Sequence, residues 1–125
     1  MIVGLGSDIV EVERIADALT RSGDKFARRI LTDDEWSIWQ ETSQKSHYLA
    51  KRFAVKEAAA KALGTGFRNG LSMHDIGTLN DDLGKPMLVL SGVAEQRMEE
   101  LGARCTHVSI SDEKHYAVAT VILES

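Results

Sequence analysis

The sequence predicts an α+β fold in which an antiparallel sheet packs against a long central helix. Three observations indicate this class. Segments with strand character stand at the start of the chain and in its second half, while helical patterns lie mostly between them. The longest helical pattern, residues 46–63, is rich in alanine and ends at a glycine. Strands and helices do not alternate one by one, as they would in a parallel sheet.

The first half of the chain begins with a strand and continues with helices. Residues 2–10 are mostly apolar and β-branched, which predicts a strand. Residues 12–21 place apolar side chains at helical spacing. Thr32 and Glu35 have the spacing of a capping box, which opens a further helix. The long helix at 46–63 follows.

The second half of the chain is richer in strands and turns. We expect four strands here, at residues 75–80, 87–90, 107–111 and 116–123. The connection between the first two, Asp-Asp-Leu-Gly-Lys-Pro, contains the turn residues of a hairpin. A short helix is expected at residues 92–101, before the last two strands.

Length and composition limit what kind of protein this is. A chain of 125 residues is near the commonest domain size, so we expect one domain spanning residues 1–125. No apolar run is long enough to cross a bilayer, and the first residues lack the basic region of a signal peptide. The single cysteine, Cys105, excludes an intramolecular disulfide and fits a reducing compartment. We therefore expect a cytoplasmic protein that does not associate with a membrane.

The distribution of charge suggests one kind of partner. A net charge of −4 argues against general nucleic-acid binding. Between residues 14 and 29, however, five bases stand against two acids, Asp17 and Asp24. The bases are Arg14, Arg21, Lys25, Arg28 and Arg29. The segment is either a charged helix face without a binding role or a surface that attracts an acidic partner.

The long helix carries four polar side chains that need an explanation. Glu57 and Lys61 share one face, and Arg52 and Lys56 share another. A routine surface ion pair would account for Glu57 and Lys61. The other positions from 54 to 63 are apolar, however, and burying charges is costly unless each has a partner. A phosphorylated ligand with a divalent metal would supply partners for both the cations and the carboxylate.

Asp8 is the candidate for a second metal-binding carboxylate. It stands in an apolar strand, and Gly4 and Gly6 would let another backbone or a ligand approach closely. Mg²⁺ is usually bound by one or two carboxylates together with substrate phosphates and water. Asp8 could instead hydrogen-bond to nearby backbone at the end of the strand. The run is not a dinucleotide fingerprint, because Ile9 takes the place of the third glycine, and no P-loop motif occurs.

Two further segments carry polar groups. Gly64-Thr65-Gly66 follows the C-terminus of the helix, where the dipole does not attract anions, so loop N–H groups or nearby cations would have to bind one. An ordinary helix cap is the alternative. His107, Ser109 and Ser111 alternate with apolar residues and face one side of a strand, as in many half-solvated strands. No cysteines and histidines have zinc spacing, and nothing marks a Ser–His–Asp triad.

Three segments together resemble the family of holo-[acyl-carrier-protein] synthases, the small 4′-phosphopantetheinyl transferases. They are GLGSDIVEVERI near the start, RFAVKEAAAKALGTG in the middle and HVSISDEKHYAVATVI near the end. The resemblance covers essentially the whole chain. Gly-x-Asp combined with Phe-x-x-Lys-Glu-Ala-x-x-Lys is highly specific, whereas either motif alone is not.

The resemblance implies a fold, an activity and a set of partners. Such enzymes move the 4′-phosphopantetheine group of coenzyme A onto a serine of acyl carrier protein, a step that serves fatty acid biosynthesis. They release adenosine 3′,5′-bisphosphate and use Mg²⁺. They are typically homotrimers with active sites at the subunit interfaces.

The resemblance also implies roles for particular residues. Asp8 and Glu57 match the metal ligands, and Lys61 matches the lysine beside the diphosphate; these three are the candidate catalytic residues. The positions that match contacts to coenzyme A are Arg52, Gly64, Thr65 and His107, together with Lys61. The positions in the segment that meets the acidic helix of the carrier are Arg14, Arg21, Lys25 and Arg29.

Some alternatives stay open from the sequence. The base that takes the serine proton is either Glu57 or a water held by the metal, since a carboxylate that ligates a cation is a poor base. The chain could instead be a non-catalytic coenzyme A or nucleotide-binding module that needs no metal. A third alternative is a small interaction protein that docks acidic helices through residues 14–29.

Overall fold

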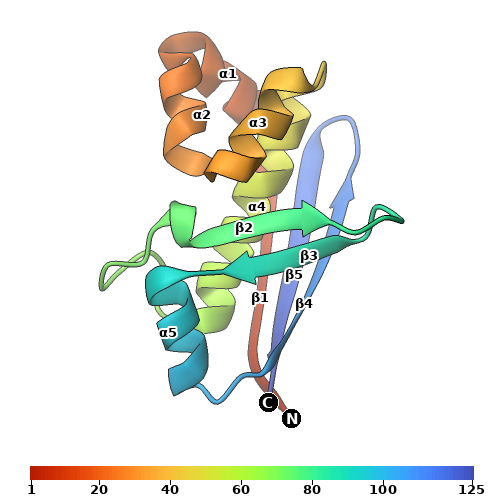
Figure 1. Cartoon of the computed structure of the whole chain (residues 1–125). Coiled ribbons are helices and arrows are strands. Elements are labelled where there is room, and N and C mark those ends of the chain that lie inside the picture. The colour runs from red at the N-terminus through yellow and green to blue at the C-terminus, as the bar shows by residue number, and fades with distance from the viewer.

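A three-stranded antiparallel sheet in the order β1–β5–β4 runs the length of the computed structural model, which describes residues 1–125. The strands are β1 (Ile2–Glu11), β5 (Tyr116–Glu124) and β4 (Cys105–Asp112). Because β1 and β5 pair along almost their whole length, the two chain ends lie next to each other (Figure 1). The predicted α+β class with an antiparallel sheet is confirmed.

The remaining elements are helices and a second, two-stranded sheet. The helices are α1 (Val12–Ser22), α2 (Asp24–Ile30), α3 (Asp33–Glu41), α4 (Lys45–Leu63) and α5 (Gly92–Glu100), with a 3₁₀ turn η1 (Met73–Asp75). A separate hairpin pairs β2 (Ile76–Asn80) with β3 (Pro86–Leu90). Figure 1 shows α1, α2 and α3 gathered at one end of α4, with α5 near the other end and the hairpin crossing between them. No helix has the length and apolar content needed to span a membrane.

All elements expected from the sequence are present, while one α-helix and the 3₁₀ turn η1 were missed. Thr32 and Glu35 form the predicted capping box, and Gly64 ends α4 in the left-handed conformation, with φ of 82°. The missed α-helix, α2, has seven residues. It follows Gly23, whose positive φ of 60° ends α1 and turns the chain. Its short length and its two buried apolar residues, Ala27 and Ile30, leave little periodicity to recognise.

Helix α4 lies directly against β1, and two glycines make this possible. A Cβ atom at Gly4 would be 2.3 Å from the Ala62 carbonyl oxygen, and one at Gly6 would be 1.9 Å from that of Ala58. No real side chain fits at such distances. Gly4 and Gly6 therefore serve the approach of another backbone, one of the two uses expected from the sequence. Asp8 lies two residues beyond Gly6, on the same face of the strand as both glycines.

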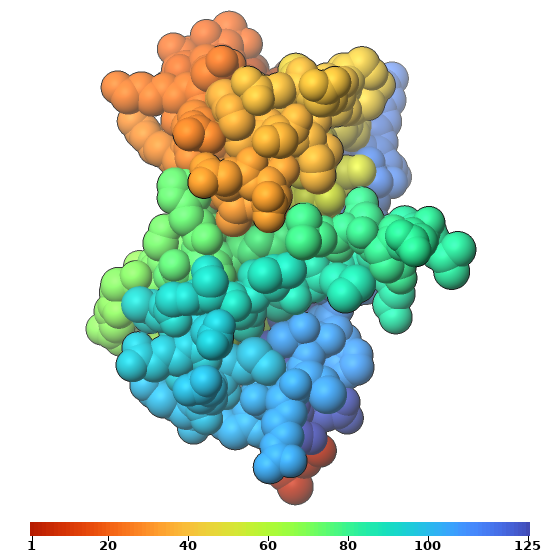
Figure 2. All heavy atoms as spheres, viewed as in Figure 1, coloured from red at the N-terminus to blue at the C-terminus, as the bar shows by residue number.

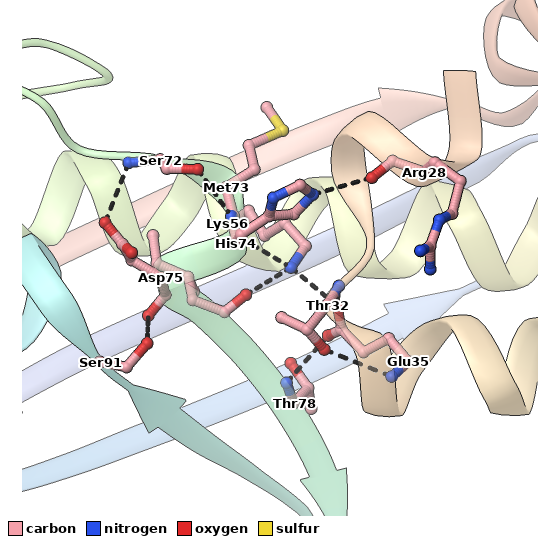
Figure 3. A network of polar contacts seen from close by, with 11 residues as sticks. Arg28, Thr32, Glu35, Lys56, Ser72, Met73, His74, Asp75, Thr78 and Ser91 are labelled. Carbon is pink, nitrogen blue, oxygen red and sulfur yellow. Dashed lines mark hydrogen bonds and ion pairs between the residues drawn. The ribbon is translucent and has the colours of Figure 1, made fainter. Parts of the chain in front are cut away.

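A buried ion pair holds α3, α4 and β2 together. Lys56 and Glu35 are each 1% exposed, and Lys56 Nζ lies 2.8 Å from Glu35 Oε1. Lys56 Nζ also donates to the carbonyls of Met73, at 3.0 Å, and Ile76. Glu35 Oε2 accepts the Thr78 N–H at 2.9 Å (Figure 3). Lys56 therefore finds its partners inside the chain, and a phosphorylated ligand is not needed to explain its burial.

Candidate active site

Asp8, Glu57 and Lys61 come together where β1 runs beneath α4. Lys61 Nζ donates to Asp8 Oδ1 at 3.0 Å and to the Ser7 carbonyl at 2.9 Å. The Asp8 side chain is 18% exposed and that of Lys61 is 53% exposed. Glu57 is partly buried one turn before Lys61 on the same helix face. Asp8 thus joins two residues that lie 49 and 53 positions later in the sequence, because the two strand glycines allow the helix to pack closely against the strand.

The electrostatics of this cluster favour an added cation. Burial raises the pKa of the Glu57 carboxyl, the nearby Asp8 carboxylate raises it further, and the Lys61 ammonium opposes both. Two carboxylates held together with one partly exposed ammonium leave negative charge at the site. A divalent cation would stabilise both ionised carboxylates at once.

A cavity of about 450 Å³ opens beside Asp8 and Glu57. Its polar lining also includes Arg14 and Arg21 from α1, and its apolar lining includes Phe53. Arg14 and Arg21 are exposed side chains with no acidic partner in the structure. Two of the predicted carrier-binding residues therefore share a cavity with the two predicted metal ligands.

Lys25 and Arg29, the other two predicted carrier-binding residues, lie elsewhere. With Arg28 and His74 they line a separate hollow of about 630 Å³ between α2 and η1. The Arg28 guanidinium lies over the Trp36 ring, 4.6 Å from its centroid. The turn at Gly23 sends α1 and α2 in different directions, so the basic segment of the sequence forms two surfaces instead of one.

Arg52 does not reach the cavity that Asp8 and Glu57 line. It is 5% exposed, and its guanidinium lies 4.7 Å from the centroid of the Tyr48 ring. Neither Arg52 Nε nor the Tyr48 hydroxyl has a hydrogen-bond partner in the chain. Burial raises the pKa of the Tyr48 phenol, and the neighbouring Arg52 guanidinium opposes this shift. Arg52 is thus a buried cation with unused hydrogen-bonding capacity.

The other predicted coenzyme A contacts lie on two further surfaces. Thr65 lines a hollow of about 230 Å³ with Arg68 and Arg97, just after Gly64. His107, on β4, lies in a hollow of about 420 Å³ beside the end of the β2–β3 hairpin. Its Nε2 is 3.0 Å from Glu124 Oε1, and this hydrogen bond lowers the pKa of the Glu124 carboxyl. A single copy of the chain therefore does not bring all the predicted contacts together.

Arg97 lies beside the predicted coenzyme A contact Thr65, a position that was not predicted from the sequence. Its Nε donates to the carbonyl of Leu63, the last residue of α4, at 3.0 Å. A cation at the C-terminus of a helix stabilises the unpaired carbonyls there, so Arg97 supports the start of the Gly64–Gly66 loop. Arg97 lies on α5, 34 residues from Leu63, and no local pattern in the sequence signals this contact.

The available ligands suit Mg²⁺ better than a metal that needs a complete protein site. The structure has no group of three or more histidine, cysteine, aspartate or glutamate side chains that could hold a metal. Asp8 and Glu57 supply two carboxylates, as is usual where substrate phosphates and water complete the shell of Mg²⁺. The donor set therefore fits a metal that is bound together with a phosphorylated substrate.

Comparison with known proteins identifies the family. The family model of the 4′-phosphopantetheinyl transferase superfamily matches residues 4–121. The chain belongs to this superfamily. The resemblance stated from the sequence is thereby confirmed, and the chain is a 4′-phosphopantetheinyl transferase. The matched range includes all eleven predicted site residues, which run from Asp8 to His107.

Individual relatives are similar in sequence to this transferase over almost their whole length. The chain is 59% identical to a holo-[acyl-carrier-protein] synthase of Klebsiella pneumoniae over 99% of this chain and 98% of that protein. It is 60% identical to one of Vibrio campbellii, with the same shares covered.

Solved structures show the same fold. A holo-[acyl-carrier-protein] synthase of Neisseria meningitidis superposes with a TM-score of 0.94 at 42% identity, covering 100% of both chains. One from Bacillus anthracis, in complex with CoA (3′,5′-ADP), gives a TM-score of 0.83 at 43% identity, covering 100% of this chain and 98% of that one.

Proposed function

We propose that this protein transfers the 4′-phosphopantetheine group of coenzyme A to a serine of apo-acyl carrier protein and releases adenosine 3′,5′-bisphosphate. The observation that supports this most directly is the cluster of Asp8, Glu57 and Lys61 beside a cavity whose rim carries Arg14 and Arg21. The polar cluster can bind a diphosphate together with a metal, and the two arginines beside it can attract an acidic protein. We further propose that residues 1–125 act as one domain and that the reaction serves fatty acid biosynthesis in the cytoplasm.

Coenzyme A is the proposed phosphopantetheine donor. A relative from Bacillus anthracis was solved in complex with CoA (3′,5′-ADP). In this chain we propose that the contacts are made by Arg52, Lys61, Gly64, Thr65 and His107. Arg52 supports this role with unused donor capacity, because its buried Nε has no hydrogen-bond partner and an anion would supply one.

Assembly into a homotrimer would explain why the proposed coenzyme A contacts lie on separate surfaces of one chain. The sheet face opposite α4 has no cover, and Leu5 and Ile9 on it are each 64% exposed. Their partners on β5 are Ile122 and Val118, which extend the apolar surface. An exposed apolar sheet face is typical of a subunit interface. A neighbouring copy seated there would lie beside His107, which pairs with Ile122 in register, so it could complete the coenzyme A site.

Mg²⁺ is the proposed cofactor, with Asp8 and Glu57 as its protein ligands. When bound, it would neutralise charge on the diphosphate and on the leaving bisphosphate. The chain's own groups supply the rest of the chemistry. Lys61, being largely exposed, can extend its ammonium to a diphosphate oxygen. Glu57 is the chain's own candidate for the base that takes the serine proton, with a water held by the metal as the alternative, because a carboxylate that ligates a cation is a poor base.

The carrier's acidic helix is the proposed partner of the basic surfaces. Arg14 and Arg21 lie at the cavity where the serine must arrive, whereas Lys25 and Arg29 lie farther along, on α2. None of these four bases forms an ion pair within the chain, so each can attract an acidic helix from solution. Arg14 and Arg21 would thus guide the serine toward Glu57, while Lys25 and Arg29 would contact a more distant part of the carrier.

Mass spectrometry tests the reaction directly. Apo-acyl carrier protein is incubated with this protein, coenzyme A and Mg²⁺, and the carrier should gain the mass of one phosphopantetheine group. Asp8→Asn should abolish most of the gain, while Asp82→Asn, at the exposed tip of the β2–β3 hairpin, should leave it unchanged. If coenzyme A binds in a calorimetric titration without Mg²⁺ and the carrier gains no mass, the chain is a non-catalytic binding module.

A further inference from the structure

We propose that Lys61 occupies the cation site of the ligand-free enzyme and must leave Asp8 before a divalent metal binds there. As a consequence, metal and coenzyme A would each bind more tightly in the presence of the other. This inference rests on the proposed function, because it takes the metal and the diphosphate to be the ligands of this site. It adds a role in controlling metal binding to the role of Lys61 beside the diphosphate.

Lys61 contacts one of the two proposed metal ligands, Asp8, and a backbone carbonyl beside it. Its Nζ is held by a carboxylate oxygen of Asp8 at 3.0 Å and by the backbone carbonyl of Ser7 at 2.9 Å. Carboxylate and carbonyl oxygens are the ligands that hard cations prefer. The ammonium is therefore a stand-in cation that neutralises Asp8 while no metal is present.

The two sides of this contact differ in freedom to move. Asp8 lies on a strand clamped against α4 through Gly4 and Gly6, and its side chain is only 18% exposed. The Lys61 side chain is 53% exposed and ends a flexible four-carbon stem near the last turn of α4. The lysine is thus the partner that can leave, and the carboxylate is the partner that stays.

Because only the lysine can move away, binding of the metal and binding of coenzyme A become coupled. A metal that binds alone must displace the ammonium from Asp8 and leave it close by without a partner, which opposes binding. The diphosphate of coenzyme A offers Lys61 a new anionic partner and so frees Asp8 for the metal. Because coupling between two binding sites is reciprocal, the metal must raise the affinity for coenzyme A by the same factor.

Binding of Mn²⁺, measured from the paramagnetic resonance signal of the free ion, tests the proposal without an activity assay. Titrations use the native protein, Lys61→Gln and Lys61→Arg, each with and without coenzyme A. Lys51→Gln is the matched control, because Lys51 is a lysine of the same helix that has no carboxylate partner in the structure. Melting curves check that each variant folds.

Without coenzyme A, Lys61→Gln should bind Mn²⁺ about fivefold more tightly than the native protein, the ratio expected from losing a partly exposed ion pair. The gain in Mn²⁺ affinity on adding coenzyme A should be correspondingly smaller in this variant. Lys61→Arg keeps the cation and should behave like the native protein, as should Lys51→Gln.

Two results would overturn the proposal, and they differ in meaning. Equal or weaker Mn²⁺ binding by Lys61→Gln in the absence of coenzyme A would show that Lys61 does not compete with the metal, while the proposed function stands. If no variant bound Mn²⁺ even with coenzyme A present, the metal assignment itself would be wrong, and the proposed mechanism would fail with it.

Discussion

Glu57 is held where its charged form is unfavourable, and this has a consequence for stability. Burial and the Asp8 carboxylate raise its pKa in the folded chain, despite the opposing effect of Lys61. A carboxyl whose pKa is raised by folding adds stability below its unfolded pKa and loses that contribution as the pH rises through the folded pKa. At neutral pH the ligand-free protein therefore carries the cost of an ionised Glu57.

Replacing this carboxyl should stabilise the protein while inactivating it. Glu57→Gln keeps the shape of the side chain and removes its charge, so we expect Tm at pH 7 to rise by a few degrees in the absence of ligands. The difference from the native protein should shrink as the pH falls toward 4, where native Glu57 is protonated. Transfer to the carrier should be lost at every pH. Thermal melts across this pH range make the comparison, and a variant less stable than native at pH 7 would contradict it.

Among the secondary-structure elements, the contact between β1 and α4 determines whether the site forms. A Cβ atom at Gly6 would lie 1.9 Å from the Ala58 carbonyl oxygen, so Gly6→Ala must push the helix away from the strand. We expect a loss of about 3 kcal/mol in stability from this overpacking. Turnover should fall further than the folded fraction explains, because Glu57 and Lys61 move with the helix while Asp8 does not.

The control for this variant is Ser7→Ala, next in the chain but on the other face of β1. It should keep native stability and turnover. Kinetics corrected for folded protein, alongside denaturant unfolding, separate the two effects. A folded Gly6→Ala protein with native turnover would show that the close approach of β1 and α4 is not needed for the reaction.

The buried Lys56–Glu35 pair joins α3, α4 and β2, and its role is structural. Glu35→Gln would leave the Lys56 ammonium buried without a counter-charge, a change that typically costs about 3–5 kcal/mol. The double variant Glu35→Gln with Lys56→Met removes both charges and should recover most of this loss. Urea unfolding of the single and double variants measures it. If the double variant were no more stable than Glu35→Gln alone, the pair would not act as a unit.

Elements and their ends could be predicted largely because their causes are local. The capping box at Thr32 and the terminal glycine of α4 are short-range patterns, and both are confirmed. Contacts between distant segments could not be predicted in the same way. The partners of Lys56 lie 17 to 21 residues away, so the sequence shows a buried lysine but not the carboxylate and carbonyls that stabilise it.

For the whole molecule, the uncovered sheet face predicts that copies of the chain associate. Ile9 is 64% exposed on this face, opposite the side that holds Asp8. Ile9→Asp should convert the proposed homotrimer to monomers, because a carboxylate in an apolar interface is strongly unfavourable. Light scattering would measure the mass in solution. Thr20→Asp, on an exposed position of α1, is the control and should leave the assembly intact. Persistence of the native mass in Ile9→Asp would place the interface elsewhere.

The basic segment could be located from the sequence, but its division in space could not. Arg14 and Arg21 line the cavity with Glu57, whereas Lys25 and Arg29 line another hollow, because Gly23 separates α1 from α2. The Arg14 side chain is exposed and has no ion pair in the structure, so it is available to a partner. The two surfaces should therefore differ in what they contribute to carrier binding.

Charge reversal separates the two basic surfaces. Arg14→Glu or Arg21→Glu should raise KM for the carrier about tenfold at low salt and also lower kcat, because these residues lie where the serine must meet Glu57. Lys25→Glu or Arg29→Glu should raise KM alone, since a distant contact affects encounter and docking but not the alignment of the reacting groups.

Salt provides the internal check on this comparison. Exposed charges are screened over a Debye length of about 8 Å at physiological ionic strength, so native KM for the carrier should rise with salt and all four variants should show a flatter dependence. KM for coenzyme A should stay close to native in the two α2 variants, which change no residue near Asp8. If reversing Lys25 or Arg29 left carrier kinetics at low salt unchanged, the carrier would dock on the α1 surface alone, and only Arg14 and Arg21 would remain as its contacts.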